Sequence, residues 1–251
     1  MARYADALTE EVRLERMRPE AVEAAKAAQP AIYVPFGAIE WHGYHNPVGL
    51  DAIKAHEQLV GLAARAGGVV YPPVFFGAGG GHSAWPSSFM VSPAPMAQLV
   101  IELLHGFERD GYRKAILLSG HYPNRPEYLD AARAAYLEVG GTMAVLALIE
   151  NQVPGGAGDH AAKAETSSML HLMPELVDMD RLRSGIDDDF GGPAEVVNWM
   201  LPEYEGHPCY GLVGVDPRAH ASAEFGAAET ERLLDFLTKW LATPTDRAVD
   251  S

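Results

Sequence analysis

The sequence predicts an α/β fold in which a mostly parallel sheet carries helices on both faces. Short apolar runs, typical of strands buried on both sides, alternate with segments of helical periodicity. The chain of 251 residues can bury the core that such a sheet needs. Nothing in the sequence marks a second domain, so we expect a single domain, 1–251, with its core at about 31–241 and an irregular excursion at 184–210.

After a charged, helical opening, the first half of the chain supplies two strands and two helices. Residues 31–38 (AIYVPFGA) form a nearly continuous apolar run and predict the first parallel strand. Residues 51–66 have helical spacing, begin at a capping aspartate and end before two glycines. Residues 69–76 predict a second strand, and its two prolines favour an edge position. Residues 93–109 follow a Gly-rich loop and begin with proline in the first helical turn.

The second half continues the same alternation up to the irregular excursion. Apolar runs again predict strands, and helical spacing predicts the segments between them. The remaining predicted elements, in order, are a strand at 114–119, a helix at 125–139, a strand at 142–150, a helix at 161–173, a strand near 210–215 and an amphipathic helix at 221–241.

The charge of the chain restricts its partners. It holds 19 Lys and Arg against 34 Asp and Glu, a formal net charge of -15, which disfavours binding to nucleic acid or to anionic membranes. The single cysteine, Cys209, has no partner for an internal disulfide, as is common in a reducing compartment. No stretch approaches the roughly 20 apolar residues of a membrane span, and the charged start does not resemble a signal peptide, so we expect a cytoplasmic protein.

Ligand-type residues follow two of the predicted strands. In open α/β sheets, ligands bind outside the carboxyl ends of the strands. Glu40 and His42 follow the first strand, two residues apart, a spacing that points both side chains to one side in extended backbone. Asp51 opens the next helix, and His121 follows the strand at 114–119. Each alone has a structural explanation, such as helix capping for Asp51, but their joint placement predicts one shared site.

Mixed carboxylate and imidazole ligands predict a divalent transition metal, Zn, Mn or Fe, with open positions for water. With two carboxylates present, one could bridge a pair of metals, so one or two ions per chain are expected. Cys209 has no adjacent base, which argues against a thiol nucleophile.

The motif E-W-H-G-Y-H-N-P-V-G-L-D resembles the pattern E-Q-H-G-P-H-L-P-L-G-T-D of the creatininase (creatinine amidohydrolase) family. The shared positions are Glu40, His42, Gly43, His45, Pro47, Gly49 and Asp51. Four later segments also resemble family motifs: G-H-S-A-W-P-S-S at 81–88, S-G-H-Y-P-N at 119–124, D-H-A-A-K-A-E-T-S at 159–167, and G-V-D-P-R-A-H-A-S at 214–222.

The resemblance implies a three-layer α/β/α fold, a metal centre that is often binuclear, and a closed homo-oligomer, frequently a hexamer. It also implies that Glu40 and His121 bind one metal, His42 binds the other, and Asp51 bridges them. Where creatininase has a glutamate two residues after the ligand histidine, this chain has Pro123. Glu165 is our candidate for the missing ligand.

Further positions are candidates for contact with a small-molecule substrate or for proton transfer. The candidate substrate-binding residues are His45, His82, Trp85 and Tyr122. For the first three the alternative is a structural role in a loop. The resemblance also implies that Asp159 and His160 transfer a proton to the leaving nitrogen. For Asp159 the alternative is a cap on the following helix.

Three functions are compatible with these residues. The first is hydrolysis of a C–N bond in a small, polar, cyclic substrate by a metal-bound hydroxide. Residues 152–158 lack the tryptophan that creatininase has there, which argues against creatinine itself. The second is hydrolysis of a C–C bond in a cyclic polyol ketone derived from inositol. The third is a catalytically silent scaffold, which Pro123 favours.

Overall fold

The computed structural model describes residues 10–182 and 194–244 and contains a four-stranded parallel sheet of order β2-β1-β3-β4. The strands are β1 (Ala31–Phe36), β2 (Val69–Val70), β3 (Lys114–Ser119) and β4 (Ala144–Ile149). The three long strands are aligned in register, with Ala31 beside Lys114 and Lys114 beside Ala144. Their carboxyl ends therefore finish at one edge, as a shared site at that edge requires.

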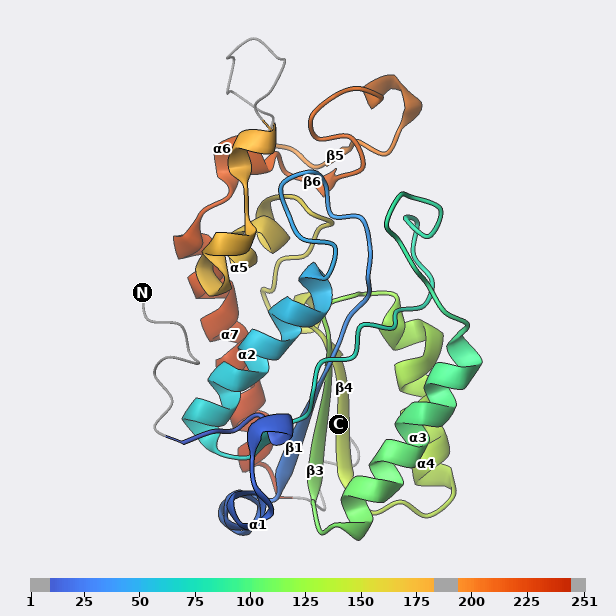
Figure 1. Ribbon diagram of the computed structural model, residues 1–251, viewed down its shortest axis with the longest axis vertical. Coiled ribbons are helices and arrows are strands. Elements are labelled where there is room, and N and C mark those ends of the chain that lie inside the picture. Colours follow the sequence, from blue (N-terminus) through green and yellow to red (C-terminus); the bar gives the residue numbers. More distant parts are fainter. Residues whose placement is uncertain (1–9, 183–193, 245–251) are drawn as a thin grey trace.

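Helices cover both faces of this sheet, which makes the fold a three-layer α/β/α sandwich (Figure 1). The helices of one face are α2 (Leu50–Ala66), α5 (Lys163–Leu172) and α7 (Ala223–Ala242), and those of the other are α3 (Pro93–Arg109) and α4 (Asp130–Glu138). Tyr33 of β1 packs in the core that contains α2 and α7, while its neighbours Ile32 and Val34 pack with α3 and α4. Alternate side chains thus enter opposite cores, which explains the continuous apolar runs of the strands.

The second strand is shorter than predicted. Residues 69–76 were expected to be a strand, but β2 contains only Val69 and Val70. The following Pro72 and Pro73 have no N–H to donate, so regular pairing ends there. Val74 then donates its N–H to the carbonyl of Pro35, which keeps the segment beside β1 at the edge.

The last predicted strand lies outside the central sheet. Within 210–215, only β6 (Val213–Gly214) is a strand, and it pairs antiparallel with β5 (Val197–Asn198). The N–H of Trp199 donates to the carbonyl of Leu212, and both side chains pack in a small hydrophobic core that is separate from the cores of the main sheet. The excursion at 184–210 is irregular in its described part, 194–210, apart from β5 and a short 3₁₀ turn, whereas 184–193 lies outside the described residues.

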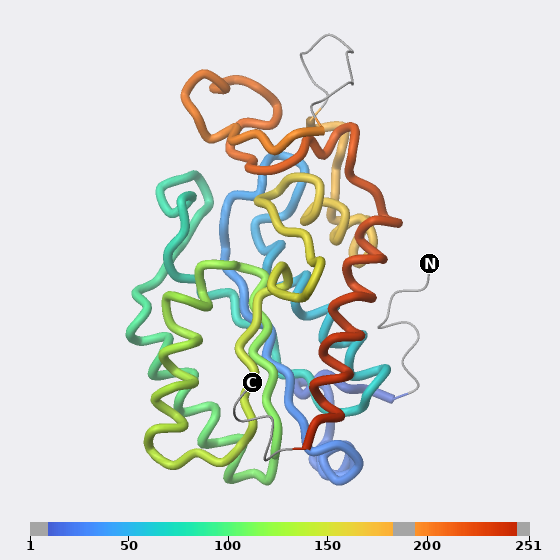
Figure 2. The backbone as a smooth tube through the Cα atoms, turned by 180° about the vertical axis from the view of Figure 1, so that it is seen from behind, coloured from blue at the N-terminus to red at the C-terminus, as the bar shows by residue number. Residues whose placement is uncertain are grey.

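The remaining helices include α1 (Pro19–Ala28) at the foot of the sheet and the short α6 (Pro217–His220). The predicted helix at 125–139 starts with a π-helical turn, Arg125–Leu129, before α4 begins. Among the described helices, none combines the length and the apolar character that crossing a lipid bilayer demands. In the view from behind, loops from distant parts of the chain gather above the carboxyl ends of the strands (Figure 2).

Candidate metal centre

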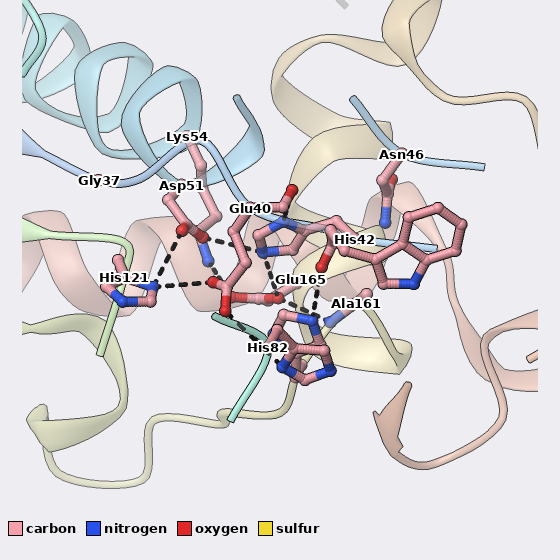
Figure 3. A network of polar contacts seen from close by, with 12 residues as sticks. Gly37, Glu40, His42, Asn46, Asp51, Lys54, His82, His121, Ala161 and Glu165 are labelled. Carbon is pink, nitrogen blue, oxygen red and sulfur yellow. Dashed lines mark hydrogen bonds and ion pairs between the residues drawn. The ribbon is translucent and has the colours of Figure 1, made fainter. Parts of the chain in front are cut away.

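Five buried ligand-type side chains meet above the ends of β1 and β3 (Figure 3). Glu40 and His42 follow β1, Asp51 lies in the first turn of α2, His121 follows β3, and Glu165 lies in the first turn of α5. The sequence grouped four of these residues, three after strands and Asp51 at the start of a helix, and the structure brings all five together. Their side chains point toward one another in the centre of the site.

Glycine permits the close approach of two of these segments. A Cβ atom at Gly120, just before His121, would lie 2.2 Å from the carbonyl oxygen of Asp51. That atom belongs to the backbone and cannot rotate away. The segment after β3 can therefore pass against the start of α2 only because residue 120 has no side chain.

The first group consists of Glu40, Asp51 and His121. Nδ1 of His121 lies 2.8 Å from Glu40 Oε2 and 3.3 Å from Asp51 Oδ2. One donor atom from each of the three residues lies within 4.8 Å of the others, close enough to share a metal ion.

The second group faces the other oxygen of Asp51. Nε2 of His42 lies 3.0 Å from Asp51 Oδ1 and 3.6 Å from Glu165 Oε2. His160 completes this group, since one donor atom each of His42, His160 and Glu165 lies within 4.8 Å of the others. Asp51 thus presents one oxygen to each group, which is the arrangement that a bridging carboxylate needs.

Three histidines are oriented by backbone carbonyl groups. His42 donates from Nδ1 to the carbonyl of Glu40 at 3.1 Å. His82 donates from Nε2 to the carbonyl of Gly211 at 2.7 Å, and His121 donates from Nε2 to the carbonyl of Ala78 at 3.3 Å. A carbonyl oxygen only accepts, so these ring nitrogens carry a proton. In each ring the other nitrogen faces a carboxylate. Metal-binding histidines characteristically donate their second N–H in this way.

The electrostatics of the site fit a cation. Burial acts to lower the pKa of His42 and of His121, yet the neighbouring carboxylates raise the pKa of His42 to about 9 and that of His121 to about 10. His42 Nε2 and Asp51 Oδ2 are buried, and their contacts are with other ligand-type side chains, at 3.0 Å from Asp51 Oδ1 and 3.3 Å from His121 Nδ1. The carboxylates therefore favour positive charge at the centre of the site, and a divalent ion could take the place of the protons on these two rings.

A cleft of about 360 Å³ opens beside these ligands. Of the candidate residues for substrate contact and proton transfer, His82, Tyr122, Asp159 and His160 line it. Pro123 also lines it and offers no donor atom, so the position of the missing glutamate is apolar here.

His45 and Trp85 do not line the cleft. Nε2 of His45 lies 2.8 Å from Oγ1 of Thr166, which ties the loop after β1 to α5. The ring of Trp85 packs behind His82, with centroids 5.4 Å apart, and against Tyr210 at 4.8 Å. Trp85 also lies 6.0 Å from the ring of Trp41, which stands between Glu40 and His42, so both residues support segments that carry ligand-type side chains.

Asp159 and His160 are held by the backbone. The carboxylate of Asp159 accepts N–H groups from Ala164 and Glu165 at the start of α5, as a capping residue does. Burial, followed by the charge of Glu165, raises the pKa of Asp159 to about 7. His160 donates from Nε2 to the carbonyl of Trp41 at 2.8 Å, and burial lowers its pKa well below the ordinary histidine value.

Sequence reasoning missed two charged residues behind the site. Lys54 is fully buried and lies 2.9 Å from Glu165 Oε1 and 3.0 Å from Glu150 Oε2. The available signal was a lysine one helical turn after Asp51, on the buried face of a helix. A lysine on such a face needs carboxylate partners.

An α/β/α sandwich with a cleft lined by histidines and carboxylates at the carboxyl edge of its sheet defines the class of this protein. A family model described as creatinine amidohydrolase matches residues 15–241. The chain belongs to the creatininase family.

Three relatives are similar over much of the chain. Creatinine amidohydrolase of Pseudomonas putida is 28% identical over 180 residues, covering 62% of this chain and 69% of that protein. The mycofactocin precursor peptide peptidase of Mycolicibacterium smegmatis is 32% identical over 162 residues, covering 62% of this chain and 63% of the peptidase, less than two thirds of its length. The 3-dehydro-scyllo-inosose hydrolase of Thermotoga maritima is 26% identical over 245 residues, covering 83% of this chain and 75% of that protein.

Solved structures show the same fold. A creatinine amidohydrolase (creatininase) superposes with a TM-score of 0.73 at 24% identity, covering 92% of this chain and 96% of that one. A creatininase variant described as Zn-Zn type superposes with a TM-score of 0.71 at 25% identity, covering 92% and 97%. The named relatives are hydrolases, and this chain is a hydrolase of their family.

Proposed function

We propose that this chain hydrolyses an amide-type C–N bond of a small, polar, cyclic substrate with one or two divalent transition metal ions. The observation that carries the proposal is the position of Asp51, whose two oxygens face His42 and His121 separately at 3.0 and 3.3 Å. Ligand-type side chains from three other segments converge on this carboxylate in a buried site next to a cleft.

Glu40, Asp51 and His121 would hold the first ion, and His42 and Glu165 the second, with Asp51 shared. Zn, Mn and Fe all suit this mixture of carboxylate and imidazole ligands. The related creatininase of Zn-Zn type supports two ions, and another creatininase structure is named for Mn. Such ions supply Lewis-acid polarisation of a carbonyl and activation of water near neutral pH.

The cleft offers a place for the substrate beside the ligands. Part of its lining is glycine backbone, and Tyr122 and Asn151 add polar side chains. The glycines are Gly80, Gly81, Gly120 and Gly158. Polar groups and small residues fit a compact substrate that forms hydrogen bonds. Residues 152–158 contain no tryptophan, and we therefore propose a substrate other than creatinine.

His160 is the proposed proton carrier for the leaving nitrogen, with Asp159 fixing the segment before it. Since Nε2 of His160 donates to Trp41, Nδ1 is the nitrogen with a lone pair in the neutral ring. That nitrogen can accept a proton during attack on the carbonyl and return it to the leaving group. Asp159 is anchored by two backbone N–H groups, which fixes the position of its neighbour.

A second candidate function is hydrolysis of a C–C bond in a cyclic polyol ketone. The inosose hydrolase covers 83% of this chain, a larger share than the creatinine amidohydrolase or the peptidase named above. A polyol also suits a cleft that has tyrosine and asparagine rather than stacked indole rings.

Purified protein should be assayed with Zn²⁺ or Mn²⁺ on a panel of cyclic amides, short peptides and inositol-derived ketones. Turnover of amides that is lost in Glu40→Gln and kept in Glu102→Gln, an exposed carboxylate of α3, would support the first function. Turnover of ketones alone would select the second. If no metal binds and no substrate turns over, the chain is a silent scaffold and both proposals fail.

A further inference from the structure

Glu165 is the candidate ligand for the position where creatininase has a glutamate and this chain has Pro123. It lies in the first turn of α5 and is buried. Its Oε1 accepts a hydrogen bond from Lys54 Nζ at 2.9 Å, and its Oε2 accepts one from the N–H of Ala161 at 2.7 Å. Each oxygen therefore has a fixed direction.

Lys54 is built into the site. It is fully buried on α2, one turn after Asp51, and crosses from that helix to α5 (Figure 3). Its second carboxylate partner, Glu150, follows β4 and lies 3.0 Å away. Charged groups are costly to bury, and removing one partner of such a group leaves an uncompensated buried charge.

Ala161, whose N–H binds the other oxygen of Glu165, has a strained backbone conformation. Ala161 has a φ of 53°, in the left-handed region that residues with a Cβ atom rarely adopt. This conformation accompanies the 2.7 Å hydrogen bond from its N–H to Glu165 Oε2. Strain of this kind persists where the surrounding structure enforces it, and it is common at functional sites.

Oε2 of Glu165 accepts a single N–H, from Ala161, and keeps a second lone pair that could bind a metal. Because Lys54 occupies Oε1, Oε2 is the oxygen that faces Nε2 of His42, at 3.6 Å. We propose that Lys54 is a positioning residue that makes Glu165 a ligand through Oε2 alone, and so completes the second metal position where Pro123 offers nothing. The inference rests on the proposed function, since it assumes that the centre binds metal.

The test is a titration of metal-free protein with Mn²⁺, measured by calorimetry and by the exchange-coupled EPR signal of a Mn pair. Lys54→Met alone leaves two buried carboxylates without their cationic partner and is a poor probe, because it can prevent folding. The informative pair is Glu150→Gln and the double variant Lys54→Met/Glu150→Gln. The double variant has the same net charge as the native chain, so a general charge effect is excluded.

We expect the native protein and Glu150→Gln to bind two Mn²⁺ ions with coupled spins. In the double variant the first ion should bind as before, while the second should bind ten- to a hundredfold more weakly, the usual effect of removing a residue that orients a ligand. Lys114→Met serves as the control. Lys114 is a buried lysine that donates to backbone carbonyls at the end of α7, and its loss should not change metal binding.

The outcomes separate this inference from the proposed function. If the double variant binds both ions with native affinity, Lys54 has only a structural role and the inference is overturned. If the native protein binds one ion, and Glu165→Gln binds it equally well, Glu165 is not a ligand, and the inference falls while a one-metal hydrolase remains. If the native protein binds no ion, the proposed function fails as well.

Discussion

Gly120→Ala should damage the metal centre without touching any ligand. The new Cβ atom would lie 2.2 Å from the carbonyl oxygen and 2.8 Å from the carbonyl carbon of Asp51. A separation below 3.0 Å is essentially never seen for a Cβ atom, so the segment before His121 must move by at least 0.8 Å. His121 would move with it, away from Glu40 at 2.8 Å and Asp51 at 3.3 Å.

The size of the effect follows from that displacement. A misplacement of about 1 Å in a catalytic arrangement costs on the order of a hundredfold in rate. We therefore expect Gly120→Ala to lose about a hundredfold in kcat/KM and to bind Mn²⁺ at least tenfold more weakly. Overpacking should also lower stability by about 1–3 kcal/mol.

Gly106→Ala is the matched control. Gly106 lies inside α3, and its nearest neighbour to a new Cβ atom is the end of the Arg109 side chain at 3.9 Å. This substitution should raise stability by about 0.5–1 kcal/mol, since alanine favours a helix, and should leave metal affinity unchanged. Native-like Mn²⁺ affinity and activity in Gly120→Ala would refute the reasoning, because the close approach would then not position His121.

Four further predictions concern metal removal, the cysteine, acid stability and assembly. Chelation of a metal present at about a hundred times its Kd should lower the free energy of unfolding by about 2.7 kcal/mol, seen as a lower Tm that Zn²⁺ restores; an unchanged Tm would contradict tight binding. Burial raises the pKa of the Cys209 thiol to about 12, so a thiol reagent at pH 8 should label it only after denaturation, and rapid labelling of native protein would count against its burial. Hydrogen bonding to Arg13 lowers the pKa of Glu11 to about 2, so the stability that this ion pair contributes is present above pH 4.5 and is lost as the pH falls through about 2. Glu11→Gln should therefore lower Tm slightly at pH 7 and not at pH 2. An equal loss of Tm at both pH values would show that charge is not the cause. By family resemblance, we expect light scattering to show a homo-oligomer, a hexamer. Phe76 and Phe89 are exposed and lie on paired segments, so we expect them in the contact between subunits, and Phe89→Glu should shift the mass toward that of a monomer. An unshifted mass would show that these residues do not form the contact.

The main sheet could be predicted from the sequence because its strands are buried on both faces. The runs at 31–38, 114–119 and 142–150 are apolar at almost every position, which few other local structures explain. β2 was predicted too long, because an apolar run does not show where two prolines end the pairing. β6 joined a separate small sheet because its partner, β5, lies in an excursion with no strand signal in its sequence.

The candidate site was predictable to the extent that ligand chemistry is local. Glu40, His42 and His121 follow clear strands, and Asp51 opens the helix after the first motif, so the rules for strand ends and helix starts were enough to group them. The rule does not tell which loop residues line a cleft. Tyr122 and His82 line it, whereas His45 and Trp85 are directed to Thr166 and Tyr210, contacts that depend on how distant segments pack.

By itself the sequence determined the composition of this protein's site: which residue types are present, and at which edge of the sheet most of them stand. Only the tertiary structure decided their partners. Asp51 presents one oxygen to His42 and the other to His121, and Lys54 reaches Glu165 across 111 positions of the chain. Side-chain direction and burial arise from packing between segments that are far apart in sequence, so neither the shared carboxylate nor the lysine that holds Glu165 has a signature in the local pattern.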